Sequence, residues 1–544
     1  MAKKEQVQTD DLMSYAQATA CLTREEKIGQ FFMPAVFIND TEEEIVKIES
    51  LIRDHHVGGI CFFHSRASAA TNYEGEEHTV VYNAESLLVL EQLVERYQRA
   101  AKYPLMIAID AEWGLAMRIE NAPQFPYAIT LGAMEDSEEL VYEVGRHIAH
   151  DCKKAGIHWN FAPVADINLN PENPVIGYRS FGEDKLAVTR NALAYLNGMH
   201  SEGVLGAAKH FPGHGDTATD SHLGLPVIGK DLGSLESQEL YPFRQMIDAG
   251  IEAIMAGHLS VPALTGGKNT PASVSGEIIQ GTLREKLGFG GVVVSDALNM
   301  HSVSRMFPEK GLLEWEAFRA GNDVLCFSEQ VKEGIARILE NAPEQRIEES
   351  FKRIWGLKQK AMQNQGSPPA RGFDHEALNQ RLAAASLTME VGSPGDLQDF
   401  RNAGFSVLGI SSNTPQGFVT ALEDRGDIGT MSWVSPAEAS PASIRTDGEK
   451  WLVLLYPPSV KPTNTFGISA QILQQINTLM KTKEVVLYLF GNPYVLQYLE
   501  FQKARAVVIA YQDFPCFQEN AFRHFLGEVK AQGKLPVTLK TRLP

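Results

Sequence analysis

Six ionisable side chains lie within the fourteen-residue segment KHFPGHGDTATDSH, which runs from Lys209 to His222. They are Lys209, His210, His214, Asp216, Asp220 and His222. Glycine and proline interrupt regular structure here, so the segment is predicted to form a loop after the apolar residues 204–208. Asp220 precedes His222 by two positions, a spacing that allows a carboxylate to hold one ring nitrogen while the other faces outward. Such a pair can transfer protons near neutral pH.

Polar residues also stand at or near the ends of several apolar segments elsewhere in the chain. Eight such segments alternate with stretches of helical spacing such as 84–101 and 138–156, which predicts a (β/α)8 barrel of the TIM type. The predicted strands are 31–37, 58–63, 104–110, 158–166, 206–211, 253–260, 290–298 and 321–327.

The carboxyl ends of barrel strands converge on one face, where active sites are built. The residues expected on that face are Asp110, Asp166, Lys209, His210, His258 and Asp296. For Asp166, a helix N-cap is an alternative interpretation.

A second domain is expected after the barrel. Residues 344–362 have helical spacing, and the stretch at 363–375 is rich in glycine, proline and polar residues. We therefore predict a barrel domain at 1–362, a linker at 363–375 and a smaller α/β sandwich domain at 376–544. Its sheet should be mainly parallel, with strands at 405–410, 451–456, 484–490 and 504–511.

Composition limits the possible partners. The chain has 544 residues, 44% of them hydrophobic and 21% charged, as in a soluble globular protein. A net charge of −18 argues against nucleic-acid binding. No apolar run reaches membrane-spanning or signal-peptide length, so no membrane partner and a cytoplasmic location are expected. The five cysteines are odd in number and lack CxxC spacing, which favours buried free thiols.

Four motifs carry a resemblance to a known family. They are the segment 209–222, GGVVVSDALNM at 290–300, GYRSFGED at 177–184 and IDAEWGLAMRI at 109–119. The chain resembles family 3 glycoside hydrolases of the β-N-acetylhexosaminidase branch over residues 20 to 362, and its second domain resembles the partner domain of many members. The resemblance implies a retaining exo-hydrolase that removes terminal β-N-acetylglucosamine, often from peptidoglycan fragments, without a cofactor. A cytoplasmic location would favour cell-wall recycling.

The resemblance also implies residue roles. Asp296 matches the nucleophile, and a carboxylate at a strand end suits attack on an anomeric carbon. His222 matches the acid/base residue and is supported by Asp220. Glycosidases mostly use a second carboxylic acid there, and a histidine avoids placing two anions beside the transition state.

The predicted contacts to the hydroxyl groups of the terminal sugar come from charged side chains on the same face. These residues are Asp110, Arg118, Arg179, Lys209 and His210, and His258 is a further candidate from its place on the rim. We expect His214 to organise the loop and Asp216 to be solvated. The chain departs from the family at Trp113, where members commonly carry glycine, and this leaves the substrate preference open.

Other interpretations of the same residues remain. His210, His214, Asp220 and His222 could bind a metal ion, although the family match gives them a metal-free role. Ser221 is a weak candidate nucleophile, because no G-x-S-x-G motif is present. The protein could also be a non-catalytic sugar-binding protein, a β-glucosidase, or a phosphorylase in which phosphate replaces water. The expected partner is a small carbohydrate, bound by a monomer or a homodimer.

Overall fold

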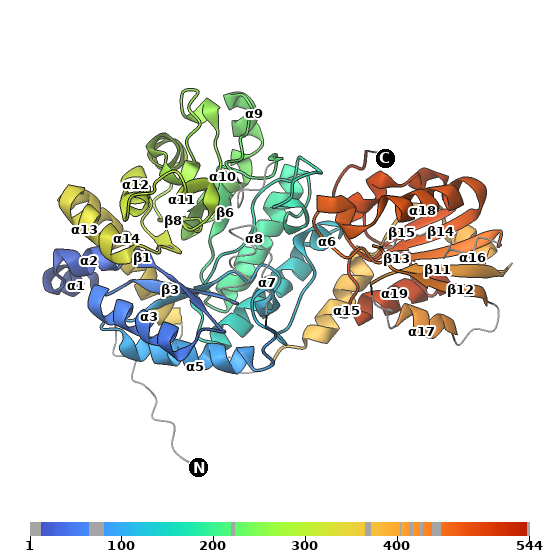
Figure 1. The fold of residues 1–544 in the computed structure, drawn as a ribbon, viewed down its shortest axis with the longest axis horizontal. Helices are drawn as coiled ribbons and strands as arrows, with labels where there is room; N and C mark the ends of the chain where they lie inside the picture. The colour runs from blue at the N-terminus through green and yellow to red at the C-terminus, as the bar shows by residue number, and fades with distance from the viewer. Residues whose placement is uncertain are drawn as a thin grey trace, which may run out of the picture. The chain divides into compact units, whose positions relative to one another are not determined.

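A computed structural model describes residues 12–64, 81–218, 224–364, 372–402, 404–412, 417–423, 428–437 and 448–540 (Figure 1). The chain forms two compact units. The first unit comprises Met1–Gln124, Val144–Asp166 and Ala192–Gly372, and the second comprises Phe125–Glu143, Ile167–Asn191 and Phe373–Pro544.

Parallel strands form the centre of the first unit, and each of the eight predicted segments contains at least one, with two in 31–37. The ladders run β2-β3-β4-β5, β6-β7-β8 and β1-β9. Isolated parallel bridges between Trp159 and Leu205 and between Val294 and Val324 continue this order. The strands are β1 (Phe32–Met33), β2 (Ala35–Phe37), β3 (Gly59–Phe63), β4 (Met106–Ile109), β5 (Trp159–Asn160), β6 (Ala208–Phe211), β7 (Ala253–Ala256), β8 (Val292–Ser295) and β9 (Leu325–Cys326).

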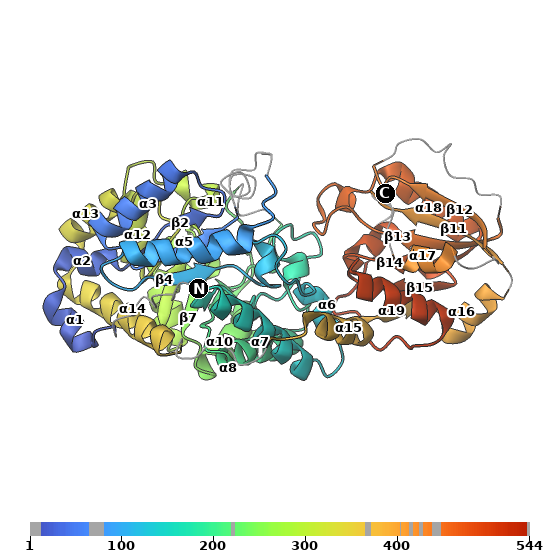
Figure 2. The ribbon, with the colours of Figure 1, turned by 90° about the horizontal axis from the view of Figure 1, so that it is seen from below.

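Helices lie around these strands in both views (Figures 1 and 2). The predicted helices at 84–101, 138–156 and 344–362 correspond to α5 (Ser86–Ala100), α7 (Glu138–Lys154) and α14 (Glu344–Asn364). The others are α1 (Tyr15–Cys21), α2 (Arg24–Gly29), α3 (Glu42–His55), α8 (Lys185–Ser201), α9 (Leu232–Ser237), α10 (Leu240–Asp248), α11 (His301–Ser304), α12 (Leu312–Ala320) and α13 (Val331–Asn341), and a π-helical segment spans Glu277–Lys286.

Local sequence explains where these helices begin. At α3, the Thr41 side chain accepts a hydrogen bond from the Glu44 amide, and the Glu44 carboxylate accepts one from the Thr41 amide at 2.8 Å. This capping box satisfies two amide groups that the helix itself leaves without partners. None of the helices within the described ranges is long and apolar enough to cross a membrane.

The second unit contains one six-stranded sheet in the order β10-β15-β14-β13-β11-β12. All neighbours are parallel except β10 and β15, so the predicted mainly parallel sheet is observed. The four predicted strands are β11 (Phe405–Ile410), β13 (Lys450–Leu455), β14 (Glu484–Leu489) and β15 (Ala506–Ile509); the sequence did not predict the edge strands β10 (Thr388–Val391) and β12 (Ile428–Val434).

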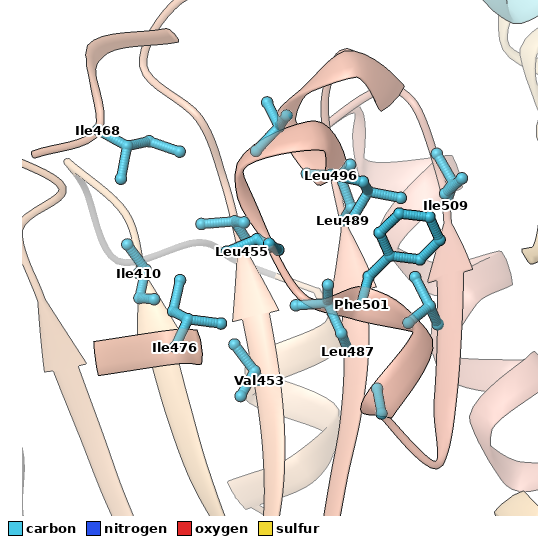
Figure 3. Close-up of a cluster of buried hydrophobic side chains, with 14 of the residues drawn as sticks. Ile410, Val453, Leu455, Ile468, Ile476, Leu487, Leu489, Leu496, Phe501 and Ile509 are labelled. Atoms are coloured by element: carbon cyan, nitrogen blue, oxygen red, sulfur yellow. The ribbon is translucent and has the colours of Figure 1, made fainter. Parts of the chain in front are cut away.

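Helices complete the second unit, and apolar side chains are buried on both faces of its sheet. On one face, Leu455, Leu487 and Ile509 pack with Leu496 and Phe501 (Figure 3). The helices are α6 (Ala128–Gly132), α15 (His375–Ser386), α16 (Pro394–Arg401), α17 (Phe418–Glu423), α18 (Ala470–Thr482) and α19 (Pro515–Leu526).

Two segments that we expected in the first domain, 125–143 and 167–191, belong to the second unit. The Asn168 side-chain Nδ2 donates to the Tyr494 hydroxyl at 2.9 Å, and the Thr538 backbone amide donates to the Glu183 carboxylate at 2.9 Å. Most of the expected linker at 363–375, namely 365–371, falls outside the described residues, while its first two residues end α14 and its last begins α15. The exact limits of the folding domains stay a prediction.

The five cysteines are free thiols. Cys61, Cys152 and Cys326 are buried as predicted, whereas Cys21 is exposed and Cys516 is half-buried. Burial raises the pKa of Cys152 and of Cys326. Because the thiolate is the reactive form, these two side chains behave as apolar packing groups.

Candidate active site

The predicted rim residues of the first unit stand at or near the carboxyl ends of parallel strands. Asp110 directly follows β4, Lys209 and His210 are the two central residues of the four-residue strand β6, and Asp296 directly follows β8. The Asp296 amide donates to the Ala256 carbonyl at 2.9 Å, which fixes the end of β8 against β7. The alternation of strand and helix therefore brings these polar residues to one end of the strands, as expected.

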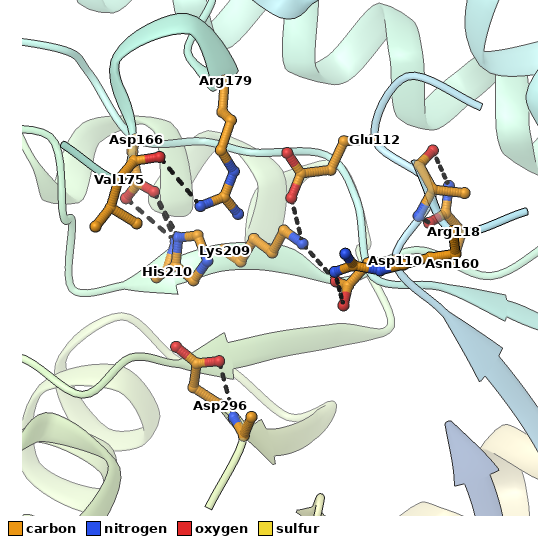
Figure 4. Close-up of polar contacts among 12 residues, drawn as sticks. Asp110, Glu112, Arg118, Asn160, Asp166, Val175, Arg179, Lys209, His210 and Asp296 are labelled. Carbon is orange, nitrogen blue, oxygen red and sulfur yellow. Dashed lines mark hydrogen bonds and ion pairs between the residues drawn. The ribbon is translucent and has the colours of Figure 1, made fainter. Parts of the chain in front are cut away.

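Lys209 is the centre of a buried ionic cluster. Its Nζ lies 2.7 Å from Asp110 Oδ1 and 2.6 Å from Glu112 Oε1, so the ammonium stands between two carboxylates (Figure 4). Arg118 Nη2 lies 3.2 Å from Asp110 Oδ2, and the Arg118 guanidinium stacks 3.8 Å from the Phe63 ring centroid. The structure thus joins three of the predicted sugar-binding residues, Asp110, Arg118 and Lys209, in one network.

This network keeps Asp110 ionised. Burial alone would raise the pKa of Asp110, but the positive charges of Lys209 and Arg118 outweigh burial and the opposing charge of Glu112, so the pKa falls below its ordinary value. An ionised carboxylate accepts hydrogen bonds, and the two cations donate them. The cluster therefore presents both acceptors and donors suited to sugar hydroxyl groups.

A second cluster centres on Asp166, whose side chain is fully buried. Its carboxylate accepts hydrogen bonds from the His214 amide at 2.7 Å, from the His210 amide at 3.1 Å, and from His210 Nδ1 at 2.7 Å. The N-cap interpretation of Asp166 is wrong, because no helix begins at the residues that follow it. Asp166 instead fixes the start of the loop and the orientation of the His210 ring.

The charges in this cluster are set by burial. Burial raises the pKa of Asp166, but the charge and hydrogen bond of His210 together with His214 lower it below its ordinary value overall. Burial and the neighbouring His210 lower the pKa of His214 to about 4, against the opposing effect of Asp166 and Asp296. At neutral pH the cluster therefore holds an ionised Asp166 and an uncharged His214.

His214 and Asp216 hold the loop in place. His214 is buried, and its Nδ1 lies 2.8 Å from the Thr217 hydroxyl, which agrees with the predicted organising role. Asp216, which we expected to be solvated, forms an ion pair with Lys230 at 2.9 Å. Lys230 also lies 2.5 Å from the buried Glu239. The Asp216 side chain is 31% exposed, so it stays partly solvated as expected while the ion pair ties it to Lys230.

His258 supports the segment after β8. Its Nε2 lies 2.9 Å from the Ala297 carbonyl and its Nδ1 lies 2.7 Å from the Ser273 hydroxyl. Because a carbonyl only accepts, Nε2 carries a proton and donates it to Ala297, while Nδ1 is hydrogen-bonded to the Ser273 hydroxyl. Both ring nitrogens have protein partners, so the geometry favours a supporting role over the predicted sugar contact. Ala297 in turn donates its amide to Asp296 Oδ1 at 2.8 Å, which orients the predicted nucleophile.

Comparison with known proteins identifies the family. The model of the glycosyl hydrolase family 3 N-terminal domain matches residues 23–357, more than half of the chain. The chain belongs to glycosyl hydrolase family 3. The predicted class of enzyme, a glycoside hydrolase, is confirmed by this match.

Relatives within family 3 extend the comparison. A protein named β-hexosaminidase A from Pseudoalteromonas piscicida is 36% identical over 334 residues, which cover 55% of this chain and 55% of that protein. A protein named β-N-acetylglucosaminidase/β-glucosidase from Cellulomonas fimi is 25% identical over 97% of this chain and 96% of its own length. The chain thus spans about half of the first relative and nearly all of the second.

Among solved structures, a family 3 β-N-acetylglucosaminidase from Paenibacillus sp. str. FPU-7 is similar with a TM-score of 0.76 at 26% identity. The match covers 96% of this chain and 100% of that one. The predicted resemblance to the β-N-acetylhexosaminidase branch of family 3 is confirmed.

The remaining predicted site residues are Asp220, His222 and Arg179. Asp220 and His222, with the alternative nucleophile Ser221, lie outside the described residues. Arg179 belongs to the second unit, where its Nη1 donates to the Val175 carbonyl at 3.3 Å. The catalytic roles assigned to Asp220 and His222 and the sugar contact assigned to Arg179 stay predictions of the family resemblance.

The sequence analysis did not identify the roles of Glu112 and Asn160 in the site. The Asn160 side chain, at the end of β5, accepts from the Ala111 amide at 2.9 Å and donates to the Ala111 carbonyl at 3.2 Å. It thereby fixes the turn that carries Asp110 and Glu112. A carboxylate two residues after Asp110 was the signal for Glu112, because alternate residues of an extended segment share a side.

A metal centre is not evident from the residues that the structure describes. Among them, no group of three or more histidine, cysteine, aspartate or glutamate side chains is placed to hold an ion. Two of the four predicted alternative ligands, Asp220 and His222, fall in the undescribed segment 219–223.

Proposed function

We propose that this protein is a retaining exo-acting β-N-acetylglucosaminidase. The observation that carries the proposal is the position of Asp296, which directly follows β8 and accepts the Ala297 amide at 2.8 Å. It stands at the same end of the strands as the cluster of Lys209, Asp110 and Arg118. The names of the relatives from Pseudoalteromonas piscicida and Cellulomonas fimi support the choice of an N-acetylated sugar.

The proposed reaction is a double displacement. His222, oriented by Asp220, protonates the leaving oxygen while Asp296 attacks the anomeric carbon and forms a covalent glycosyl-enzyme. His222 then removes a proton from water, which attacks the same carbon and releases the sugar with retained configuration. Asp110, Arg118, Arg179, Lys209 and His210 hold the hydroxyl groups of the terminal sugar. The reaction needs no cofactor.

We also propose that the strands of the first unit close into the predicted (β/α)8 barrel. The observed ladders and the bridges from Trp159 to Leu205 and from Val294 to Val324 support this arrangement, since together they relate all eight strand segments in sequence order. A closed barrel would place every strand end on a single rim.

The proposed natural substrate is a fragment of peptidoglycan, and the proposed setting is cell-wall recycling in the cytoplasm. Both rest on the family resemblance and on the apolar pattern of the sequence. The proposed partner is accordingly a small carbohydrate.

A direct test compares release of an aryl group from a β-N-acetylglucosaminide and from a β-glucoside, with Asp296→Asn as the control. We expect release from the first substrate and its loss in the variant, because the amide cannot act as the nucleophile. His222→Ala should impair substrates with poor leaving groups more than activated aryl glycosides. Equal losses on both would contradict the acid role of His222.

A second candidate function keeps the same site and changes the sugar or the acceptor. The Cellulomonas fimi relative is named for β-glucosidase activity as well, which favours testing the β-glucoside directly. Adding phosphate to the assay separates hydrolysis from phosphorolysis, because only a phosphorylase yields a sugar 1-phosphate. Absence of release from either glycoside would contradict the proposed function.

A further inference from the structure

Glu112 is the member of the ionic cluster to which the sequence assigned no role. Its carboxylate lies 2.6 Å from Lys209 Nζ, and the side chains of both residues are almost fully buried, at 6% and 2% exposed. Asp110 contacts the same ammonium from its other side at 2.7 Å. Lys209 is therefore held by two carboxylates where one would already neutralise it.

The backbone around Glu112 is fixed by contacts that do not involve its side chain. The Tyr195 hydroxyl donates to the Ala111 carbonyl at 3.1 Å and to the Glu112 carbonyl at 3.0 Å. Asn160 holds Ala111 from the neighbouring strand end. Because these bonds hold the turn, a change of the Glu112 side chain can alter the charge at Lys209 without releasing the turn itself.

The charges of the cluster balance. Asp110 and Glu112 contribute two negative charges, and Lys209 and Arg118 contribute two positive charges. Without Glu112, the same surface would carry one excess positive charge close to the place where Lys209 and Asp110 meet the sugar. In a buried setting, a unit charge at this range changes ligand affinity strongly.

We infer that Glu112 is a positioning and charge-balancing residue. Through Lys209 it makes this part of the site accept an uncharged sugar and reject an anionic one. Glu112 orients the ammonium toward the sugar and cancels the attraction that Lys209 would otherwise exert on a carboxylate. A substrate group bearing a negative charge would meet two fixed carboxylates beside the lysine. The inference rests on the proposed function, because it assigns the terminal sugar to this cluster.

The test measures sugar binding by calorimetry, so that it does not depend on turnover. The ligands are N-acetylglucosamine, which is neutral, and two anionic sugars, glucuronate with its carboxylate at C6 and N-acetylmuramic acid with its carboxylate on the O3 substituent. Wild-type protein is compared with Glu112→Gln, which removes the charge at constant shape, and with Glu112→Asp, which keeps the charge. Glu252→Gln is the matched control, because Glu252 is a buried carboxylate paired with His200 and Lys360 just before β7, at the opposite end of the strands.

We expect Glu112→Gln to shift the affinity ratio toward at least one of the two anionic sugars by about tenfold or more. Glu112→Asp should keep the neutral preference, and Glu252→Gln should leave the ratio unchanged. A Glu112→Gln protein that melts like wild type and binds all three sugars in the wild-type ratio would overturn the inference, as would equal weakening of all three. Failure of wild-type protein to bind any of the sugars would overturn it together with the proposed function. Binding without aryl glycoside cleavage would reject only the function.

Discussion

Replacing Asp166 by asparagine tests whether this buried carboxylate organises the site. The carboxylate accepts three N–H groups, namely the amides of His210 and His214 and the His210 ring nitrogen. An asparagine side chain offers a single acceptor oxygen, and its NH2 group would face at least one of these donors. A buried donor without an acceptor costs about 1–3 kcal/mol, and loss of a charged acceptor adds to this, so we expect a destabilisation of about 3 kcal/mol.

Chemical denaturation and hydrogen exchange measure the effect of Asp166→Asn. The urea midpoint should fall, and the amides of His210 and His214 should exchange faster, because they lose their acceptor. The value of kcat/KM should fall about a hundredfold as the His210 ring loses its fixed orientation. Asp231→Asn is the matched control, since Asp231 caps α9 at the surface and asparagine caps a helix equally well.

The pH dependence of the Asp166 effect has a definite sign. The pKa of Asp166 is lowered on folding, so its contribution to stability is present above the unfolded value of about 3.9 and is lost as the pH falls through the folded value. The stability difference between wild type and Asp166→Asn should therefore shrink as the pH falls below the unfolded value of Asp166. An unchanged urea midpoint with kcat/KM within about twofold of wild type would refute the organising role.

Three further predictions concern buried ionisable groups of the first unit. Burial lowers the pKa of His214 to about 4, so wild-type protein should lose about 3 kcal/mol of stability as the pH falls from 6.5 to 4. Urea titrations of His214→Gln should no longer show this dependence on pH. Burial lowers the pKa of Lys358 to about 7, so the unfolded chain binds an extra proton between pH 7 and 10.5 and the melting temperature should rise over this range. Lys358→Met should remove the rise. A flat profile for wild-type protein would contradict the prediction. Asp323 is fully buried and contacts Arg284 at 2.6 Å, Arg346 at 3.3 Å and Arg353 at 3.2 Å. Asp323→Asn should therefore lower the free energy of unfolding in urea by about 3–5 kcal/mol. A cost below about 1 kcal/mol would show that the three arginines find other partners.

The strands of both units could be predicted because their apolar runs are short, β-rich and bounded by glycine or polar residues. The edge strand β10 escaped prediction, since its sequence TMEV is short and only partly buried. An edge strand pairs with a neighbour on one side only, so more of its residues are exposed. Its sequence therefore shows a weaker apolar pattern. The positions of the polar residues at the strand ends could be predicted as well, because each apolar run shows where its strand ends.

The contacts that organise the site were less accessible to sequence reasoning. Asp166 acts through the backbone amides of residues 44 and 48 positions further along the chain, and amides carry no signal in the sequence. His258 stands on the rim as predicted, yet both of its ring nitrogens form hydrogen bonds within the protein, to Ser273 and to Ala297. Residue type and position indicate which side chains reach a rim, but the choice between substrate and protein partners depends on neighbours distant in sequence.

The division of the chain into units has a consequence for any attempt to shorten the protein. The chain crosses from one unit to the other five times, near residues 124, 143, 166, 191 and 372. Two of these crossings fall inside helices α7 and α8. A truncated chain that stops at the linker would therefore leave Tyr127 and Tyr178 without the apolar residues of the second unit that cover them. The two units are not interchangeable modules joined at one point, so recombination between family members should succeed only when all the crossing segments are inherited together.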